Sequence, residues 1–153
     1  MSVSLQAEPI DIAAEYAALV GALPGAAVAT FTGYVRDHSG EGPVGALELE
    51  HYPEMALKVL QNLGREAAER FRLDNWRIVH RFGLLPVSET IVWVGAVADH
   101  RGEAISACEF MMDTLKTEAP FWKREQGPEG ARWVASREQD GERRARWEQS
   151  KGV

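Results

Sequence analysis

Several features that would narrow the function of this 153-residue chain are scarce in it or missing. It has one cysteine, Cys108, so an intrachain disulfide is excluded, and this scarcity fits a reducing compartment. It contains no run near the roughly 20 apolar residues that span a membrane, and its first residues lack the pattern of a signal peptide. The sequence therefore predicts a cytoplasmic protein that does not associate with membranes.

Basic charge and metal-ligand patterns are scarce as well. The formal net charge is −6, which argues against general nucleic-acid binding, because a basic face is needed to displace counterions from phosphates. A local basic pocket is still allowed. The four histidines form no metal-binding motif and have no cysteine pair beside them, so we expect neither a metal nor another cofactor.

What is present is an ordinary globular composition, 45% hydrophobic and 26% charged, which suits one domain over residues 1–153. Apolar spacing predicts helices from Asp11 to the stop at Pro24, and over residues 53–72 and 100–116. Strands are predicted over residues 26–37, 44–52, 75–83 and 90–98, with short extended pieces at 121–125 and 131–136. Residues 137–153 form a charged tail, helical in part and loosely held. The expected fold class is α+β with a mostly antiparallel sheet, in which residues 90–98 form a central strand covered on both faces.

Two local patterns have ordinary structural interpretations. The stretch GEGPVG, residues 40–45, matches the letters of a dinucleotide-binding loop, but a strand rather than a helix follows it. It therefore predicts a hairpin loop. Cys108 lies on the apolar side of a predicted helix, which favours a buried structural thiol over a nucleophile.

The segment KTEAPFWKRE, residues 116–125, places Lys116 and Lys123 on either side of Pro120, Phe121 and Trp122. Large aromatic side chains hold a backbone still, so the two lysines are predicted to have fixed positions. Two ammonium groups held close together favour loss of a proton from one of them. A neutral lysine can act as a base or nucleophile, whereas two charged lysines can hold an anionic substrate. Lys116 could also merely complement its helix dipole, and Lys123 could be solvated.

Further cations follow the ends of two predicted strands. His100 and Arg101 come where the central strand ends and a helix begins, and the free N–H groups of a helix N-terminus favour anions. Arg36 follows Gly33, and a glycine within a strand often marks a bulge or a close approach to a ligand. Each of these segments, taken alone, fits an exposed structural role equally well.

Several blocks resemble the large, catalytic subunit of molybdopterin synthase: FTGYVRDH, LELEHYPEMA, HRFG, VWVGAVADHR and MMDTLKTEAPFWKRE followed by RWV. The resemblance covers roughly residues 5–137, and the lysine-bearing block is among its most specific parts. It implies an α/β-hammerhead fold and a homodimer that forms a heterotetramer with a small ubiquitin-like subunit. The implied sulfurtransferase needs no metal. It moves sulfur from the Gly-Gly thiocarboxylate of the small subunit to cyclic pyranopterin monophosphate, forming the dithiolene of molybdopterin in molybdenum cofactor biosynthesis.

The resemblance also implies the residues of the site. Lys116 would be the main acid–base or covalent group, and Lys123 would orient and polarise the substrate. Phe31 and Met112 would line the cavity. The other substrate-binding positions would be Tyr34, Val35, Arg36, His100, Arg101, Arg124, Glu125 and Arg137. The cations among them would offset the repulsion between the substrate phosphate and the negative thiocarboxylate.

An alternative from another functional class remains open at this point. The domain could be a non-catalytic adaptor that binds a ubiquitin-like tail or a phosphometabolite, with lysines that act only through their charge. Mixing the protein with thiocarboxylated partner and pterin precursor separates the two hypotheses, because an adaptor forms no dithiolene product.

Overall fold

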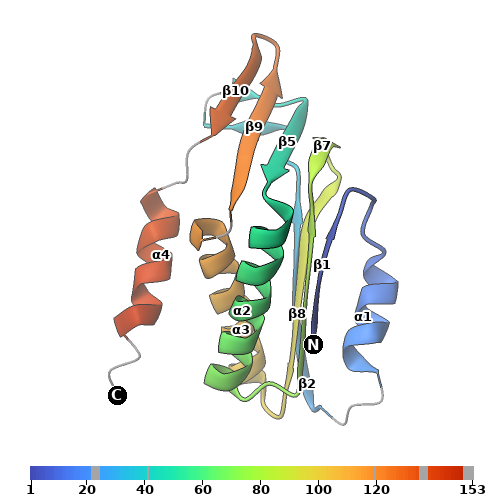
Figure 1. Cartoon of the computed structure of the whole chain (residues 1–153), viewed down its shortest axis with the longest axis vertical. Coiled ribbons are helices and arrows are strands. Elements are labelled where there is room, and N and C mark those ends of the chain that lie inside the picture. The colour runs from blue at the N-terminus through green and yellow to red at the C-terminus, as the bar shows by residue number, and fades with distance from the viewer. Residues whose placement is uncertain (22–24, 41, 119, 135–137, 150–153) are drawn as a thin grey trace.

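A computed structural model describes residues 1–21, 25–40, 42–118, 120–134 and 138–149 of the chain. Within these residues, two four-stranded sheets, a two-stranded hairpin and four helices account for the regular structure (Figure 1). The first sheet contains, in spatial order, β1 (Ser2–Gln6), β6 (Asn75–Arg81), β8 (Thr90–Ala98) and β2 (Ala27–Tyr34). Among the described strands, β1 and β6 pair in parallel and the other pairs are antiparallel, which confirms the predicted α+β class.

The second sheet extends the molecule beyond one end of the first. It contains, in spatial order, β10 (Gly130–Val134), β9 (Phe121–Gly127), β5 (Ala46–His51) and β7 (Gly83–Pro86). The hairpin of β3 (His38–Ser39) and β4 (Gly42–Pro43) lies between β2 and β5 in the chain, where a hairpin loop was predicted. Leu47 and Leu49 of β5 are buried while Glu50 is exposed, as the alternating pattern predicted.

The helices form layers on both faces of the first sheet (Figure 1). On one face lie α2 (Pro53–Phe71) and α3 (Arg101–Glu118), with α4 (Glu138–Gln149) outside α3, and on the other face lies α1 (Ile12–Val20). In β8, Val94 and Ala96 join the core under α2 and α3, whereas Trp93 and Val97 join the core under α1. The prediction that this strand is covered on both faces is confirmed.

Sequence patterns did not predict the strand β1, and they placed one helix end too late. The half-buried residues of β1 pair with β6, more than 70 positions along the chain, which no local pattern reports. Asp11 caps α1 as predicted, since its Oδ1 accepts a bond of 3.0 Å from the Ala14 N–H. The helix nevertheless ends at Val20, because Gly21 turns the backbone at a φ of +42°. Pro24 lies outside the described residues.

The charged tail is held more firmly than predicted. Part of it forms α4, which confirms the helix, but Asp113 of α3 fixes that helix in place. The buried Asp113 carboxylate accepts bonds of 3.0 Å from Arg143 Nε, 3.0 Å from Arg146 Nη2 and 2.8 Å from Trp147 Nε1. The Trp147 ring also packs edge-on against Phe110, with ring centres 5.5 Å apart. The prediction of a loosely held tail is therefore wrong for α4, because a buried carboxylate and a core aromatic contact it.

Candidate functional site

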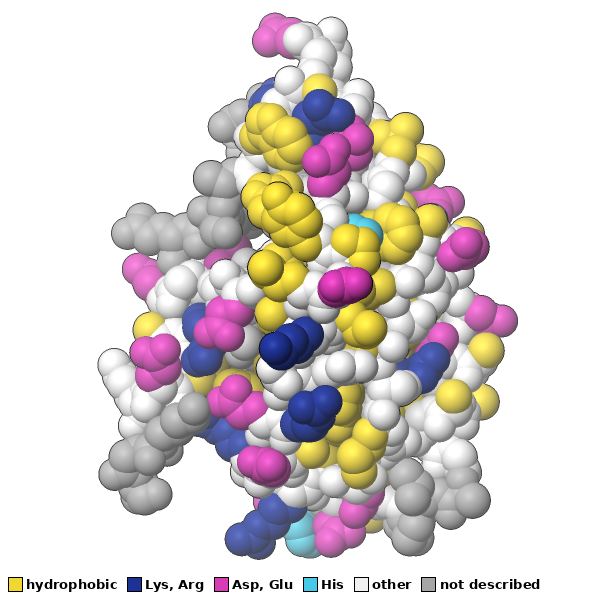
Figure 2. Space-filling model, in the orientation of Figure 1, with side chains coloured by type: hydrophobic (Ala, Val, Ile, Leu, Met, Phe, Trp, Pro, Cys, Tyr) yellow, Lys and Arg dark blue, Asp and Glu magenta, His cyan; other side chains and the backbone are white. Residues whose placement is uncertain are grey.

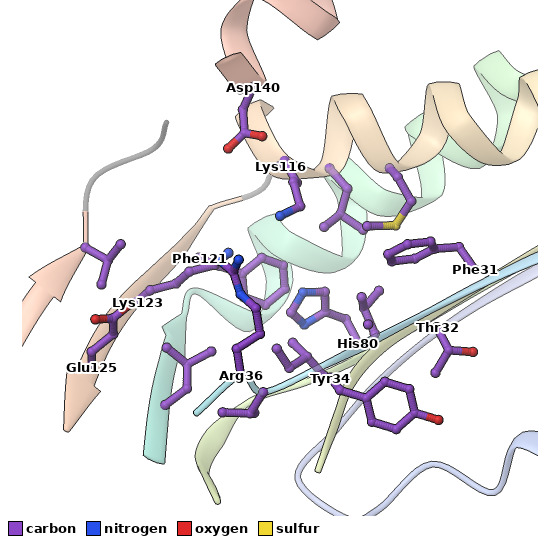
Figure 3. A pocket seen from close by; sticks show the side chains of 18 of the residues that line it. Phe31, Thr32, Tyr34, Arg36, His80, Lys116, Phe121, Lys123, Glu125 and Asp140 are labelled. Carbon is purple, nitrogen blue, oxygen red and sulfur yellow. The ribbon is translucent and has the colours of Figure 1, made fainter. Parts of the chain in front are cut away.

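A cavity of about 530 Å³ lies where the end of α3, the end of β2 and the start of β9 come together (Figure 3). This volume is in the range of small-molecule sites. Phe31, Met112 and Phe121 give part of its wall an apolar character. Predicted site residues that line it are Phe31, Tyr34, Val35, Arg36, Met112, Lys116, Lys123 and Glu125. One end of this cavity therefore combines an apolar wall with cationic side chains.

Strand alternation along β9 decides which of its side chains reach the cavity. Phe121, Lys123 and Glu125 line it, whereas Trp122 and Arg124 occupy the alternate positions and do not. Arg124 instead binds Glu48 on the neighbouring strand, with 2.5 Å between Nη2 and Oε2, and its guanidinium lies 5.3 Å from the Trp133 ring centre. Arg124 does not line this cavity, because the pleat turns its side chain toward Glu48, and its predicted substrate contact stays a prediction.

The two aromatic residues between the lysines have different roles. Phe121 joins a column of stacked rings in the order Phe82, His51, Phe121 and His80, with successive ring centres 4.4, 5.7 and 4.1 Å apart. Trp122 faces outward, remains 43% exposed and packs edge-on against Tyr52. Phe121 thus anchors the start of β9 in the interior of the protein. Both aromatic rings were predicted to hold the backbone, and of the two only Phe121 does so from the interior.

Lys116 and Arg36 reach the cavity from opposite walls. Lys116 lies in the last turn of α3 and points into the cavity, while Asp140 of α4 lines the same region (Figure 3). Arg36 follows β2, whose pairing with β8 shifts register between Gly33 and Tyr34, which agrees with a bulge, one of the two features that Gly33 indicated. A Cβ on Gly33 would lie 2.9 Å from Val92 Cγ1, so the strands approach too closely for a larger residue.

Glu125 is held by one side chain of the β3 hairpin and one of β10. Its Oε2 accepts a bond of 2.8 Å from Ser39 Oγ and one of 3.3 Å from Arg132 Nη2. The Glu125 carboxylate therefore lines the cavity with part of its hydrogen-bonding capacity already used. Its orientation is set by the β3 hairpin and by β10, rather than by a ligand.

Within a single chain, the structure does not bring all predicted cations together. His100 precedes α3 and Arg101 begins it, as predicted, but Lys116 lies fifteen residues later on the same helix. At 1.5 Å per residue these positions are about 22 Å apart along the helix axis. Neither His100 nor Arg101 lines the cavity, so one protomer does not bring the predicted cluster together and the substrate contacts of these two residues stay a prediction. Arg137 lies outside the described residues.

His80 and Asp140 are among the cavity residues that were not predicted to belong to it. His80 lies in the HRFG block, and its strand pattern indicated only which face of the sheet it occupies. Asp140 comes from α4, whose docking depends on Asp113 and could not be read from local sequence.

Other candidate chemistry has an ordinary structural explanation. Cys108 is buried, as predicted, and this burial raises the pKa of its thiol to about 12, which makes a thiolate nucleophile unfavourable. Among the described residues, no group of three or more His, Cys, Asp or Glu side chains is placed to hold a metal ion. None of the described helices combines the length and the apolar character needed to span a membrane.

Known proteins with similar sequences and structures identify the family. Residues 5–118 match the family model described as "MoaE protein". A molybdopterin synthase catalytic subunit from Ralstonia nicotianae is 46% identical over 95% of this chain and 84% of its own length. The MoaE protein of Burkholderia ambifaria is 47% identical, covers 96% of this chain and 97% of its own, and superimposes with a TM-score of 0.82. Molybdopterin synthase from Staphylococcus aureus is 31% identical, with 86% and 96% coverage and a TM-score of 0.80.

The fold and the cavity define a small α+β protein with a pocket that combines cationic and apolar side chains. The sequence comparisons identify the family to which the chain belongs. The chain belongs to the MoaE family, the catalytic subunits of molybdopterin synthase.

Proposed function

We propose that the cavity is the site of sulfur transfer from a thiocarboxylated small subunit to cyclic pyranopterin monophosphate. The observation that carries this proposal is the convergence of Arg36, Lys116 and Lys123 on one cavity in a MoaE-family protein (Figure 3). The substrate phosphate and the thiocarboxylate are both negative, so their approach is unfavourable in a cleft of low dielectric constant. These three side chains offset that repulsion although the whole chain is acidic.

The chemistry assigns different tasks to the two lysines. Attack by the thiocarboxylate sulfur forms a carbon–sulfur bond to the pterin side chain while a carbon–oxygen bond at the same carbon breaks, and that oxygen stays on the phosphate or leaves as water. Water must then cleave the acyl–sulfur bond to return a carboxylate on the small subunit. Lys116 is the group we assign to acid–base or covalent work in these steps. Lys123, held beside the Phe121 ring column, orients and polarises the substrate. Two rounds of transfer complete the dithiolene.

The functional molecule in this proposal contains two copies of the chain and two small subunits, and it works in the cytoplasm, where a sulfur donor of this type stays reduced. If His100 and Arg101 bind the same substrate as Lys116, they must come from the second copy, because α3 separates them within one copy by about 22 Å. Their exposure at the start of α3 leaves them accessible to a neighbouring protomer.

Reconstitution tests the proposal directly. The purified chain is mixed with thiocarboxylated small subunit and cyclic pyranopterin monophosphate, and the dithiolene product is quantified. The proposal predicts product with two sulfurs added per pterin. Binding of both ligands without any product would instead support the adaptor hypothesis.

A further inference from the structure

His80 is a titratable group that lines the cavity and has no part in the chemistry described above. It lies near the end of β6, an inner strand of the first sheet, and is only 3% exposed. The side chain lines the same cavity as Lys116 and Lys123, and Figure 3 shows its ring in the interior of the site. A buried imidazole on a cavity wall must either satisfy its two nitrogens within the protein or present one of them to a ligand.

One ring nitrogen is satisfied by the backbone. Nδ1 of His80 lies 2.7 Å from the carbonyl oxygen of Arg81. Because a carbonyl oxygen can only accept, Nδ1 must carry the proton and donate this bond. Burial lowers the pKa of His80 to about 4, so the imidazole is neutral at pH 7. A neutral ring protonated on Nδ1 has a lone pair on Nε2, which makes Nε2 an acceptor.

Stacking fixes the direction of this acceptor. The His80 ring lies almost parallel to the Phe121 ring, with 4.1 Å between ring centres and 15° between planes. Phe121 is held in turn by His51, so the ring cannot turn without disturbing the start of β9. The bond to the Arg81 carbonyl opposes a flip that would exchange the two nitrogens.

His80 differs from the other polar groups of the cavity because its acceptor is a ring nitrogen with a fixed direction. Arg36, Lys116 and Lys123 carry only donors when charged. The carboxylates of Asp140 and Glu125 also line the cavity and can accept, and Ser39 and Arg132 already donate to Oε2 of Glu125. The cations suit the phosphate of a ligand, whereas a flat nitrogen heterocycle bound in the same cavity also has N–H groups that need an acceptor.

We propose that His80 determines specificity for the heterocyclic part of the substrate, by accepting a hydrogen bond from a pterin N–H at Nε2. This inference rests on the proposed function, since it concerns the same substrate in the same cavity. It assigns recognition of the pterin ring to the β6 wall and recognition of the phosphate to the cations.

The test measures equilibrium binding of cyclic pyranopterin monophosphate to the full-length protein. His80→Phe keeps an aromatic ring against Phe121 but removes the acceptor, and we expect its Kd to rise by about tenfold, the effect of one lost hydrogen bond that leaves its partner unpaired. His80→Gln, which can place an amide oxygen near the Nε2 position, should recover part of the affinity. His51→Phe is the matched control. His51 stacks in the same ring column but does not line the cavity, so the His51→Phe variant should bind the precursor with the Kd of wild type.

A second measurement needs no variant. The ¹⁵N resonances of the His80 ring in the wild-type protein should show protonated Nδ1 and unprotonated Nε2, and addition of the precursor should shift the Nε2 resonance as it accepts a bond. A folded His80→Phe variant with wild-type Kd, or an Nε2 resonance that the precursor does not move, would overturn the inference alone. Failure of the wild-type protein to bind the precursor at all would overturn both the inference and the proposed function.

Discussion

Neighbouring basic residues on β9 have opposite surroundings, although they are equivalent in charge. Lys123 lines the cavity, whereas Arg124 pairs with Glu48 on the other face of the strand. The sequence alone made both of them substrate-binding candidates, because a family pattern reports positions and not the direction of each side chain. The pleat of the strand supplies that direction once the pairing of β9 with β5 is known.

Alanine variants of Lys123 and Arg124 therefore form a matched pair that tests which side chain acts in the cavity. Lys123→Ala should lower single-turnover dithiolene formation by about 10-fold or more, because a positioned charge in the cavity is lost. Lys123→Arg should recover part of the rate, since it restores the positive charge with a wider head group. Arg124→Ala removes a partly exposed ion pair, so the rate should remain near that of wild type. Equal losses in Lys123→Ala and Arg124→Ala would contradict the assignment of Lys123 to the cavity.

His80 should also make the stability of the protein depend on pH. Its pKa is about 4 in the folded chain against 6.5 as the ordinary value, so below pH 6.5 the unfolded state takes up a proton that the folded state resists. The free energy of unfolding should therefore fall as the pH drops from 6.5 to 4, by about 2 kcal/mol between pH 7 and 5 from this group. Urea unfolding of wild type and His80→Phe at both pH values measures it. The variant should lose about 2 kcal/mol less on acidification, and identical losses in the two proteins would count against a buried neutral His80.

At the scale of whole elements, the start of β9 holds Lys123 in place relative to Lys116 at the end of α3. Phe121 enters the ring column, while Trp122 packs on the surface against Tyr52. Phe121→Ala should cost about 2–3 kcal/mol of unfolding free energy, somewhat less than a fully buried phenylalanine. Trp122→Ala should cost about 1 kcal/mol, because much of its ring remains in solvent. Chemical denaturation of both variants checks the order, and a larger loss for Trp122→Ala would show that the outer ring is the anchor.

The elements that could be predicted from the sequence are those with a strong local pattern. Helix α2 and strand β8 have long apolar stripes or runs, and both were found. Strand β1 is short and depends on a partner more than 70 positions away, so its local pattern was too weak. Helix α4 reads as a charged tail, because its fixed position comes from Asp113, a buried acceptor on another helix. Local periodicity therefore found the core of the fold but missed the pieces that long-range contacts define.

At the scale of the whole molecule, apolar side chains remain on the surface. Figure 2 shows hydrophobic side chains gathered over the region of β9, β10 and the start of α2, where the exposed large residues are Tyr52, Met55, Trp122 and Trp133. A surface of this kind is typical of proteins that assemble. We expect the isolated chain to be a dimer of about twice 16.9 kDa in light scattering at micromolar concentration.

Arg101 and Lys116 are too far apart on α3 to serve one site within a single protomer, so mixed dimers can test whether a site is shared between two protomers. Lys116→Ala and Arg101→Ala should each impair turnover alone. If each site uses Lys116 from one protomer and Arg101 from the other, a mixed dimer of the two variants contains one intact site. Random exchange should then restore about a quarter of wild-type turnover, because half of the dimers are mixed and each has one of two sites. No recovery in verified mixed dimers would show that Arg101 does not act across the dimer.

The catalytic assignment of Lys116 is tested most directly by single-turnover dithiolene formation with pre-thiocarboxylated small subunit. Lys116→Ala and Lys116→Arg should both keep the melting temperature of wild type, since the side chain is exposed at the end of α3. The rate of product formation should fall by about 10² or more in both variants, because arginine keeps the charge but cannot give up its proton near neutral pH. Near wild-type turnover in Lys116→Ala would contradict the assignment of Lys116 to catalysis, and retention of the rate in Lys116→Arg alone would reduce its role to charge.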